Sequence, residues 1–308
     1  MNRRVAVCGI AKLENHYIKE WVDHHLSLGF DKIFIYDNND TDGEWIKDAV
    51  QESPRVKIID ARGKKDYQVE AYDDCYQTYG KDFDWMLFID IDEFFTLNKH
   101  STVQEYLNEY EQHFGDALII LYRWKYYDDN NLVKVENNNY NLLNRLTHPA
   151  KTVSEDMLCK QLVKTNIPGL HVNAVHQLKP KTSPVETKAE MINDQANLRF
   201  YDGTGYYSNG LDMVTQAPAY LKHFKFKTIQ EYLDFKCIRG YPMPYKNSGI
   251  FLGIREFFNN NQFTIEKYEF VKQWVTEHQD INPVKLKLLQ NEIEEIKDWS
   301  VAKDILNH

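Results

Sequence analysis

The chain has 308 residues, of which 43% are hydrophobic, and a formal net charge of −9. This length allows one or two domains with a substantial core, and the acidic balance argues against a general nucleic-acid-binding role, which needs basic surfaces. The four cysteines stand far apart and form no C-x-x-C pair, so neither a zinc site nor a disulfide framework is predicted. No window approaches 18 apolar residues, which predicts no transmembrane segment. We therefore expect a soluble, cytoplasmic protein. Peripheral contact with the inner membrane face stays open.

Strand and helix patterns alternate over the first 95 residues. The expected strands are 5–8, 33–36, 56–59 and 85–89, and the expected helices are 15–28 and 68–79. This alternation favours an α/β fold with a mainly parallel sheet and helices on both faces. Ligands bind such sheets at the carboxyl ends of the strands. The polar loops after Tyr36, Ile59 and Ile89 all fall on that edge.

The pattern is looser beyond residue 100. A helix is expected at 102–114 and strands at 117–124, 160–163, 171–175 and 220–227. From Thr264 onward the sequence is highly charged, with apolar residues at helical spacing, and predicts a C-terminal helical segment.

Three carboxylates follow the most apolar of the expected strands. Asp90, Asp92 and Glu93 come directly after the run from Trp85 to Ile89. In an extended chain residues two apart point to the same side, so Asp90 and Asp92 can converge. Like charges at the edge of a core are costly unless a cation neutralises them. Carboxylate oxygens are suitable ligands for Mn²⁺ or Mg²⁺. The alternative is a strand that merely becomes polar at the surface; we favour a metal site.

Two further loops reach the same expected edge. Asp37 ends the second strand, where it can accept hydrogen bonds from a ribose or from a base edge. The loop after the third strand carries Arg62 and Lys64, which can neutralise phosphate oxygens. An ordinary solvated turn is the alternative interpretation of that loop.

A later strand-like segment adds a histidine and more lysines. His223 stands among basic residues that include Lys225 and Lys227. Most isolated histidines are structural, but an imidazole can complete the coordination of Mn²⁺, which tolerates mixed nitrogen and oxygen ligands. An acidic metal site with basic neighbours suits a nucleotide diphosphate, whose phosphates would contact Lys225 and Lys227.

Four segments together resemble glycosyltransferases with a GT-A (Rossmann-like) fold, closest to the family-92 and family-2-like group. They are 12–29, similar to an E-x-x-Y-I-x-E-W-x-x-x-H block; 35–43, similar to a Y-D-N-N-S-T-D-G loop; 90–94, D-x-D-E-F; and 223–228, similar to H-Y-x-x-K-S. Their common order makes the resemblance specific, although 130–215 match only loosely. Two departures are Asp40 in place of Ser and Phe224 in place of Tyr.

The resemblance implies a metal-dependent transferase of polysaccharide biosynthesis. It would move a hexose from a nucleotide-sugar donor, with UDP-hexose expected, to a hydroxyl of a glycan or glycolipid acceptor. Asp37 would contact the nucleoside, Asp90 and Asp92 would bind the metal and the diphosphate, and His223 would be the late metal ligand. The implied organisation is a GT-A domain at 1–240, divided into a donor half at 1–100 and an acceptor half at 101–240, and a helical extension at 241–308.

The catalytic base is less defined. If the reaction inverts configuration, a carboxylate must take the acceptor proton, and Asp156 and Asp129 are the candidates. Asp156 resembles the member of a Glu-Asp pair that serves as base in many family-2 enzymes. Both residues can instead be helix caps or surface charges, and retention of configuration stays open.

Two other function classes compete with this interpretation. A haloacid-dehalogenase-type phosphatase also has an Asp-x-Asp motif, but normally after its first strand and with Thr or Val where this chain has Phe94. A nucleotide- or carbohydrate-binding module without catalysis would keep the pocket, and only turnover separates it from an enzyme. A metal-dependent nuclease is disfavoured by the acidic charge.

Overall fold

The computed structural model describes residues 3–114, 117–150, 159–176, 188–191, 198–201, 211–237 and 253–306. The chain divides into two compact units. The first comprises Met1–Tyr126 and Thr152–His223, and the second comprises Tyr127–Lys151 and Phe224–His308. The functional division expected at residues 100 and 240 stays a prediction.

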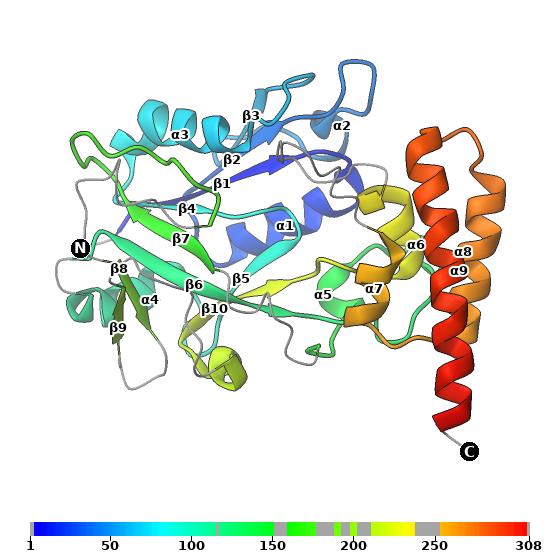
Figure 1. Cartoon of the computed structure of the whole chain (residues 1–308). Helices are drawn as coiled ribbons and strands as arrows, with labels where there is room; N and C mark the ends of the chain where they lie inside the picture. Colours follow the sequence, from blue (N-terminus) through cyan, green and yellow to red (C-terminus); the bar gives the residue numbers. More distant parts are fainter. Residues whose placement is uncertain are drawn as a thin grey trace. The chain divides into compact units, whose positions relative to one another are not determined.

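A mixed sheet forms the centre of the first unit (Figure 1). Its order is β3 (Val56–Asp60), β2 (Lys32–Asp37), β1 (Val5–Ala11), β4 (Trp85–Phe88), β7 (Cys159–Lys164), β6 (Ile119–Tyr126), β10 (Ala219–His223) and β5 (Glu93–Leu97), with β8 (Lys188–Met191) beside β6 and β9 (Leu198–Tyr201) beside β8. Strands β3, β2, β1 and β4 are parallel. Strand β7 is antiparallel to both of its neighbours, whereas β10 is parallel to β6 and antiparallel to β5. The α/β prediction is confirmed, and the parallel part coincides with the alternating first 95 residues.

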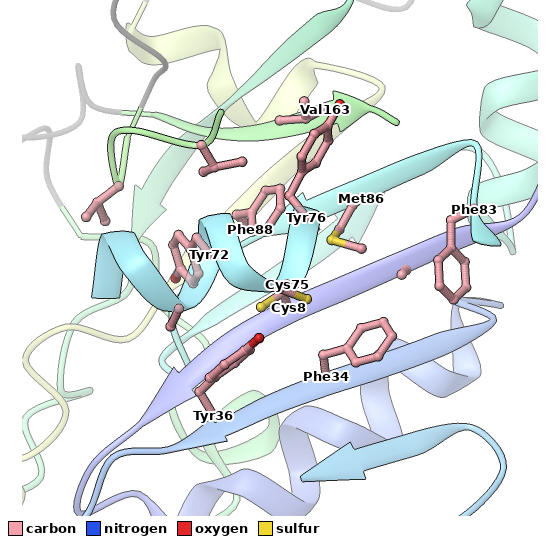
Figure 2. Close-up of a cluster of buried hydrophobic side chains, with 14 of the residues drawn as sticks. Cys8, Phe34, Tyr36, Tyr72, Cys75, Tyr76, Phe83, Met86, Phe88 and Val163 are labelled. Atoms are coloured by element: carbon pink, nitrogen blue, oxygen red, sulfur yellow. The ribbon is translucent and has the colours of Figure 1, made fainter. Parts of the chain in front are cut away.

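Helices α1 (Asn15–Ser27) and α3 (Gln68–Tyr79) cover opposite faces of the parallel strands. Cys8 of β1 lies in a buried cluster with Tyr72 and Cys75 of α3 (Figure 2). The next residue, Gly9, lies close to Trp21 of α1. Successive residues of a strand face opposite sides, so this alternation places one helix on each face.

Gly9 is a position where this packing leaves no room for a side chain. A Cβ atom there would lie 2.9 Å from Ile91 and 3.2 Å from Trp21. Gly9→Ala is therefore expected to lower the free energy of unfolding by about 1–3 kcal/mol, measured by urea denaturation. Gly80→Ala is the control, because its Cβ would meet Thr165 at an ordinary 3.7 Å on helical backbone. Equal stability of the two variants would contradict the packing argument.

The predicted strand at 171–175 is wrong, because this segment is irregular. The backbone N–H of Val172 donates to the carboxylate of Asp73 on α3 at 2.9 Å, and His171 contacts the same carboxylate. The Asp73 carboxylate therefore accepts a backbone hydrogen bond that a neighbouring strand would otherwise accept. The predicted helix at 102–114 is shorter than expected: α4 spans Val103–Tyr110 and a 3₁₀ turn spans Glu111–His113.

The second unit is mainly helical. Its helices are α5 (Leu142–Arg145), α6 (Ile229–Glu231), a π-helical turn at Tyr232–Cys237, α7 (Ile254–Asn260), α8 (Ile265–Glu277) and α9 (Pro283–Leu306), whereas α2 (Ile46–Ala49) belongs to the first unit. Arg145 and Glu231 form a buried ion pair at 2.6 Å, and the Glu231 side chain also accepts a hydrogen bond from the Thr228 backbone in a capping box.

None of the described helices is both long enough and apolar enough to cross a membrane.

Candidate functional site

Four strands of the first unit bring polar side chains to one edge of the sheet. Strands β4, β6 and β10 end there. Asp90 follows β4, whereas Tyr126 is the last residue of β6 and His223 the last residue of β10. Strand β7 is antiparallel to β4 and β6, so it begins where they end. Lys160, its second residue, consequently lies at the same edge.

Asp90 is held by three donors. Its Oδ1 accepts hydrogen bonds from Gln68 Nε2 at 2.5 Å and from the Tyr72 hydroxyl at 3.1 Å, both on α3. Its Oδ2 accepts a hydrogen bond from Lys160 Nζ at 2.8 Å. Burial alone would raise the pKa of Asp90, but the Lys160 ammonium outweighs it, so the pKa lies below its usual value. The carboxylate is therefore ionised and fixed in orientation.

Lys160 is a residue that the sequence interpretation missed. Its side chain is fully buried and lies 2.8 Å from Asp90 Oδ2 and 3.8 Å from Glu93 Oε2. Burial alone would lower its pKa, but these carboxylates raise it, so the ammonium stays charged. A lysine at the start of an apolar strand was a signal for a buried cation, but its partner became evident only from the antiparallel pairing of β7.

Asp92 and His223 form the second pair of the site. His223 Nε2 lies 3.5 Å from Asp92 Oδ1, and both side chains are buried. The His223 ring stacks on Tyr126 at 4.7 Å and meets Trp124 edge-on at 4.6 Å. Two aromatic rings therefore hold the imidazole beside the carboxylate.

Asp92 and His223 could serve as two ligands of a cation that takes its other ligands from elsewhere. Among the described residues, no group of three or more His, Cys, Asp or Glu side chains could hold a metal ion. Asp92 and His223 nevertheless supply one oxygen and one nitrogen at 3.5 Å, short enough for a shared ion. Ions such as Mg²⁺ are commonly held by one or two protein groups plus substrate phosphates. The pair fits an ion of that kind.

Glu93 and His176 are two more titratable side chains at this edge. Burial raises the pKa of Glu93 well above its usual value, although Lys160 opposes the shift. Its Oε1 is buried and has no hydrogen-bond partner in the described part of the chain. Burial, followed by the charge of Lys160, lowers the pKa of His176 to about 4. The His176 ring, edge-on to Trp124 at 5.3 Å, is therefore neutral at physiological pH.

The predicted donor-binding loops lie at the ends of β2 and β3. Asp37 accepts hydrogen bonds from Asn39 on one oxygen and from the Ile46 backbone on the other, so it organises its own loop. Arg62 contacts Asp60 and lies over the Trp45 ring, and Lys64 lies over the Tyr67 ring at 4.0 Å. The contacts of Asp37, Arg62 and Lys64 with a nucleotide stay predictions.

The other predicted site residues lie in the second unit or outside the described residues. Lys225 forms an ion pair with Glu256 at 2.7 Å, and Lys227 is buried with a left-handed φ of +57°. Asp129 is buried 2.5 Å from Lys267, which gives it a structural role, and its role as base stays a prediction. Asp156 lies outside the described residues.

Comparison with known proteins identifies a family and several relatives. The model of glycosyltransferase family 92 matches residues 3–234. A family 92 protein of Oryza sativa subsp. japonica, Os08g0121900, is 29% identical over 107 residues, which cover 34% of this chain and 18% of that protein. A family 92 protein of Ricinus communis, RCOM_0530710, is 30% identical over 109 residues, or 33% of this chain and 18% of that protein. The chain thus spans about a fifth of the length of these curated relatives.

Among solved structures, S. aureus TarS (residues 1–349 in complex with UDP) aligns with 43% of this chain and 38% of its own. The sequence identity is 13% and the TM-score is 0.33.

Proposed function

The chain belongs to glycosyltransferase family 92, and on that basis we propose that it transfers a sugar from a nucleotide diphosphate donor to a hydroxyl of an acceptor. The observation that supports this most is the pairing of Asp92 with His223 at the carboxyl edge of the sheet. Ligands of open α/β sheets bind at this edge. The donor proposed is a UDP-hexose, and the acceptor a glycan or a glycolipid at the membrane face.

Asp92 and His223 would hold Mn²⁺ or Mg²⁺, and Asp90 remains a predicted contact of the ion or of the donor. A divalent ion bound there would offset the negative charge that develops on the departing diphosphate. Arg62 and Lys64 would add positive charge beside the phosphates. Asp156 and Asp129 are the proposed candidates for the base.

The phosphatase alternative needs a nucleophilic aspartate, normally after the first strand. Asp90 instead follows β4 and is held by Lys160, Gln68 and Tyr72. The binding-module alternative is separated from an enzyme by turnover alone.

Thermal-shift titration with UDP, GDP, CDP and dTDP, each with and without Mn²⁺, tests this proposal. A nucleotide that binds only the folded state stabilises it by about 2.7 kcal/mol at a hundredfold excess over its dissociation constant. We expect UDP with Mn²⁺ to raise the unfolding midpoint and UDP alone to raise it much less. No response to any nucleotide in the presence of Mn²⁺ would contradict the proposed donor class.

A further inference from the structure

Lys160 introduces a positive charge where the sequence shows only carboxylates. The ammonium is fully buried, 2.8 Å from Asp90 and 3.8 Å from Glu93. We propose that Lys160 is a positioning residue that neutralises Asp90, and so leaves Asp92 with His223 as the pair that takes a divalent cation. This inference rests on the proposed function and assigns separate tasks to the two aspartates.

The hydrogen bonds of Asp90 support this division. Lys160 donates to one carboxylate oxygen, and Gln68 and Tyr72 donate to the other. A divalent ion that bound Asp90 directly would have to displace the ammonium or lie beside it, and like charges at such distances repel strongly in a buried setting. Asp90 is therefore better arranged to accept hydrogen bonds from these three side chains than to bind an ion.

The acidic cluster needs the ammonium for a second reason. Asp90, Asp92 and Glu93 lie within four residues at the edge of the core, where burial penalises each charged carboxylate. Breaking a buried pair by removing one partner leaves an uncompensated charge. Without Lys160 the carboxylates would have to find another cation, and a divalent ion from solution would meet that need.

The test therefore measures metal binding without any nucleotide. Lys160→Met is expected to lower the thermal midpoint, and millimolar Mn²⁺ is expected to restore part of the loss, whereas the same Mn²⁺ concentration raises the wild-type midpoint less. In Mn²⁺ titrations followed by EPR, we expect the variant to bind the ion at least about tenfold more tightly than the wild-type protein, which corresponds to about 1.4 kcal/mol. The double variant Lys160→Met/Asp90→Asn should lose this gain.

Lys164→Met is the matched control. Lys164 lies on the same strand, with its ammonium 5.7 Å from the Trp85 ring centroid. The same substitution there should leave Mn²⁺ binding at the wild-type level. Equal Mn²⁺ affinity of Lys160→Met and the wild-type protein would overturn the inference, as would a gain that survives Asp90→Asn.

A second measurement applies even if Lys160→Met does not fold. With UDP present, Asp92→Asn is expected to weaken Mn²⁺ binding at least about a hundredfold, and Asp90→Asn less than tenfold. Equal losses would overturn the division of tasks while leaving the proposed function intact. If UDP does not bind the wild-type protein at all, the proposed function fails, and the nucleotide-free comparison of Lys160→Met still decides the role of Lys160.

Discussion

Asp92→Asn is expected to reduce Mn²⁺-dependent turnover of a nucleotide sugar at least about a thousandfold while leaving the fold intact. The substitution removes a carboxylate oxygen 3.5 Å from His223 Nε2 and keeps the size of the side chain. Metal-ion stabilisation of a departing phosphate contributes several kcal/mol, and about 4 kcal/mol corresponds to a thousandfold change in rate. The measurement is Mn²⁺-dependent release of the nucleotide from a panel of UDP sugars.

Asp23→Asn is the control for this experiment. Asp23 lies on α1 in an exposed pair with Lys19, so the same chemical change should leave turnover unaltered. Circular dichroism and the thermal midpoint of both variants establish that the fold is kept. Undiminished turnover by Asp92→Asn would disprove the metal assignment.

Arg145→Met is expected to destabilise the protein by about 3–5 kcal/mol. Arg145 donates to both carboxylate oxygens of Glu231, at 2.9 and 2.6 Å, and the two side chains are 6% and 1% exposed. Removal of the guanidinium leaves a buried carboxylate without its main partner. Urea denaturation measures the loss, and Lys99→Met is the control because the Lys99–Glu109 pair is exposed and should matter far less.

The stability that Arg145→Met loses should also depend on pH. Burial alone would raise the pKa of Glu231, but hydrogen bonds and charge from Arg145, with Thr228, hold it below its usual value. A carboxyl with a lowered pKa stabilises the folded state above its unfolded pKa, and this stabilisation is lost as the pH falls through the folded pKa. The stability difference between wild type and Arg145→Met should therefore shrink in acid. A constant difference down to the folded pKa would contradict the assigned ion pair.

Local patterns in the sequence were sufficient for the four parallel strands and for the two long helices that cover them. Apolar runs and helical spacing predicted β1 to β4, α1 and α3 to within a few residues. Helix α1 stops before Gly29, whose φ of +87° is the left-handed conformation expected of a terminating glycine. These features depend on neighbours in sequence, which is why they could be predicted without a structure.

Only part of the candidate site could be predicted from the sequence. The sequence by itself determined that Asp90 and Asp92 end a buried strand and that His223 closes a later strand. Only the tertiary structure decided that Lys160 lies against Asp90, because β7 pairs antiparallel with β4 and starts at the edge where β4 ends. The direction and place of β7 depend on its pairing with β4, whose nearest partners, Phe88 and Gln161, are 73 residues apart, and no local pattern records such a pairing.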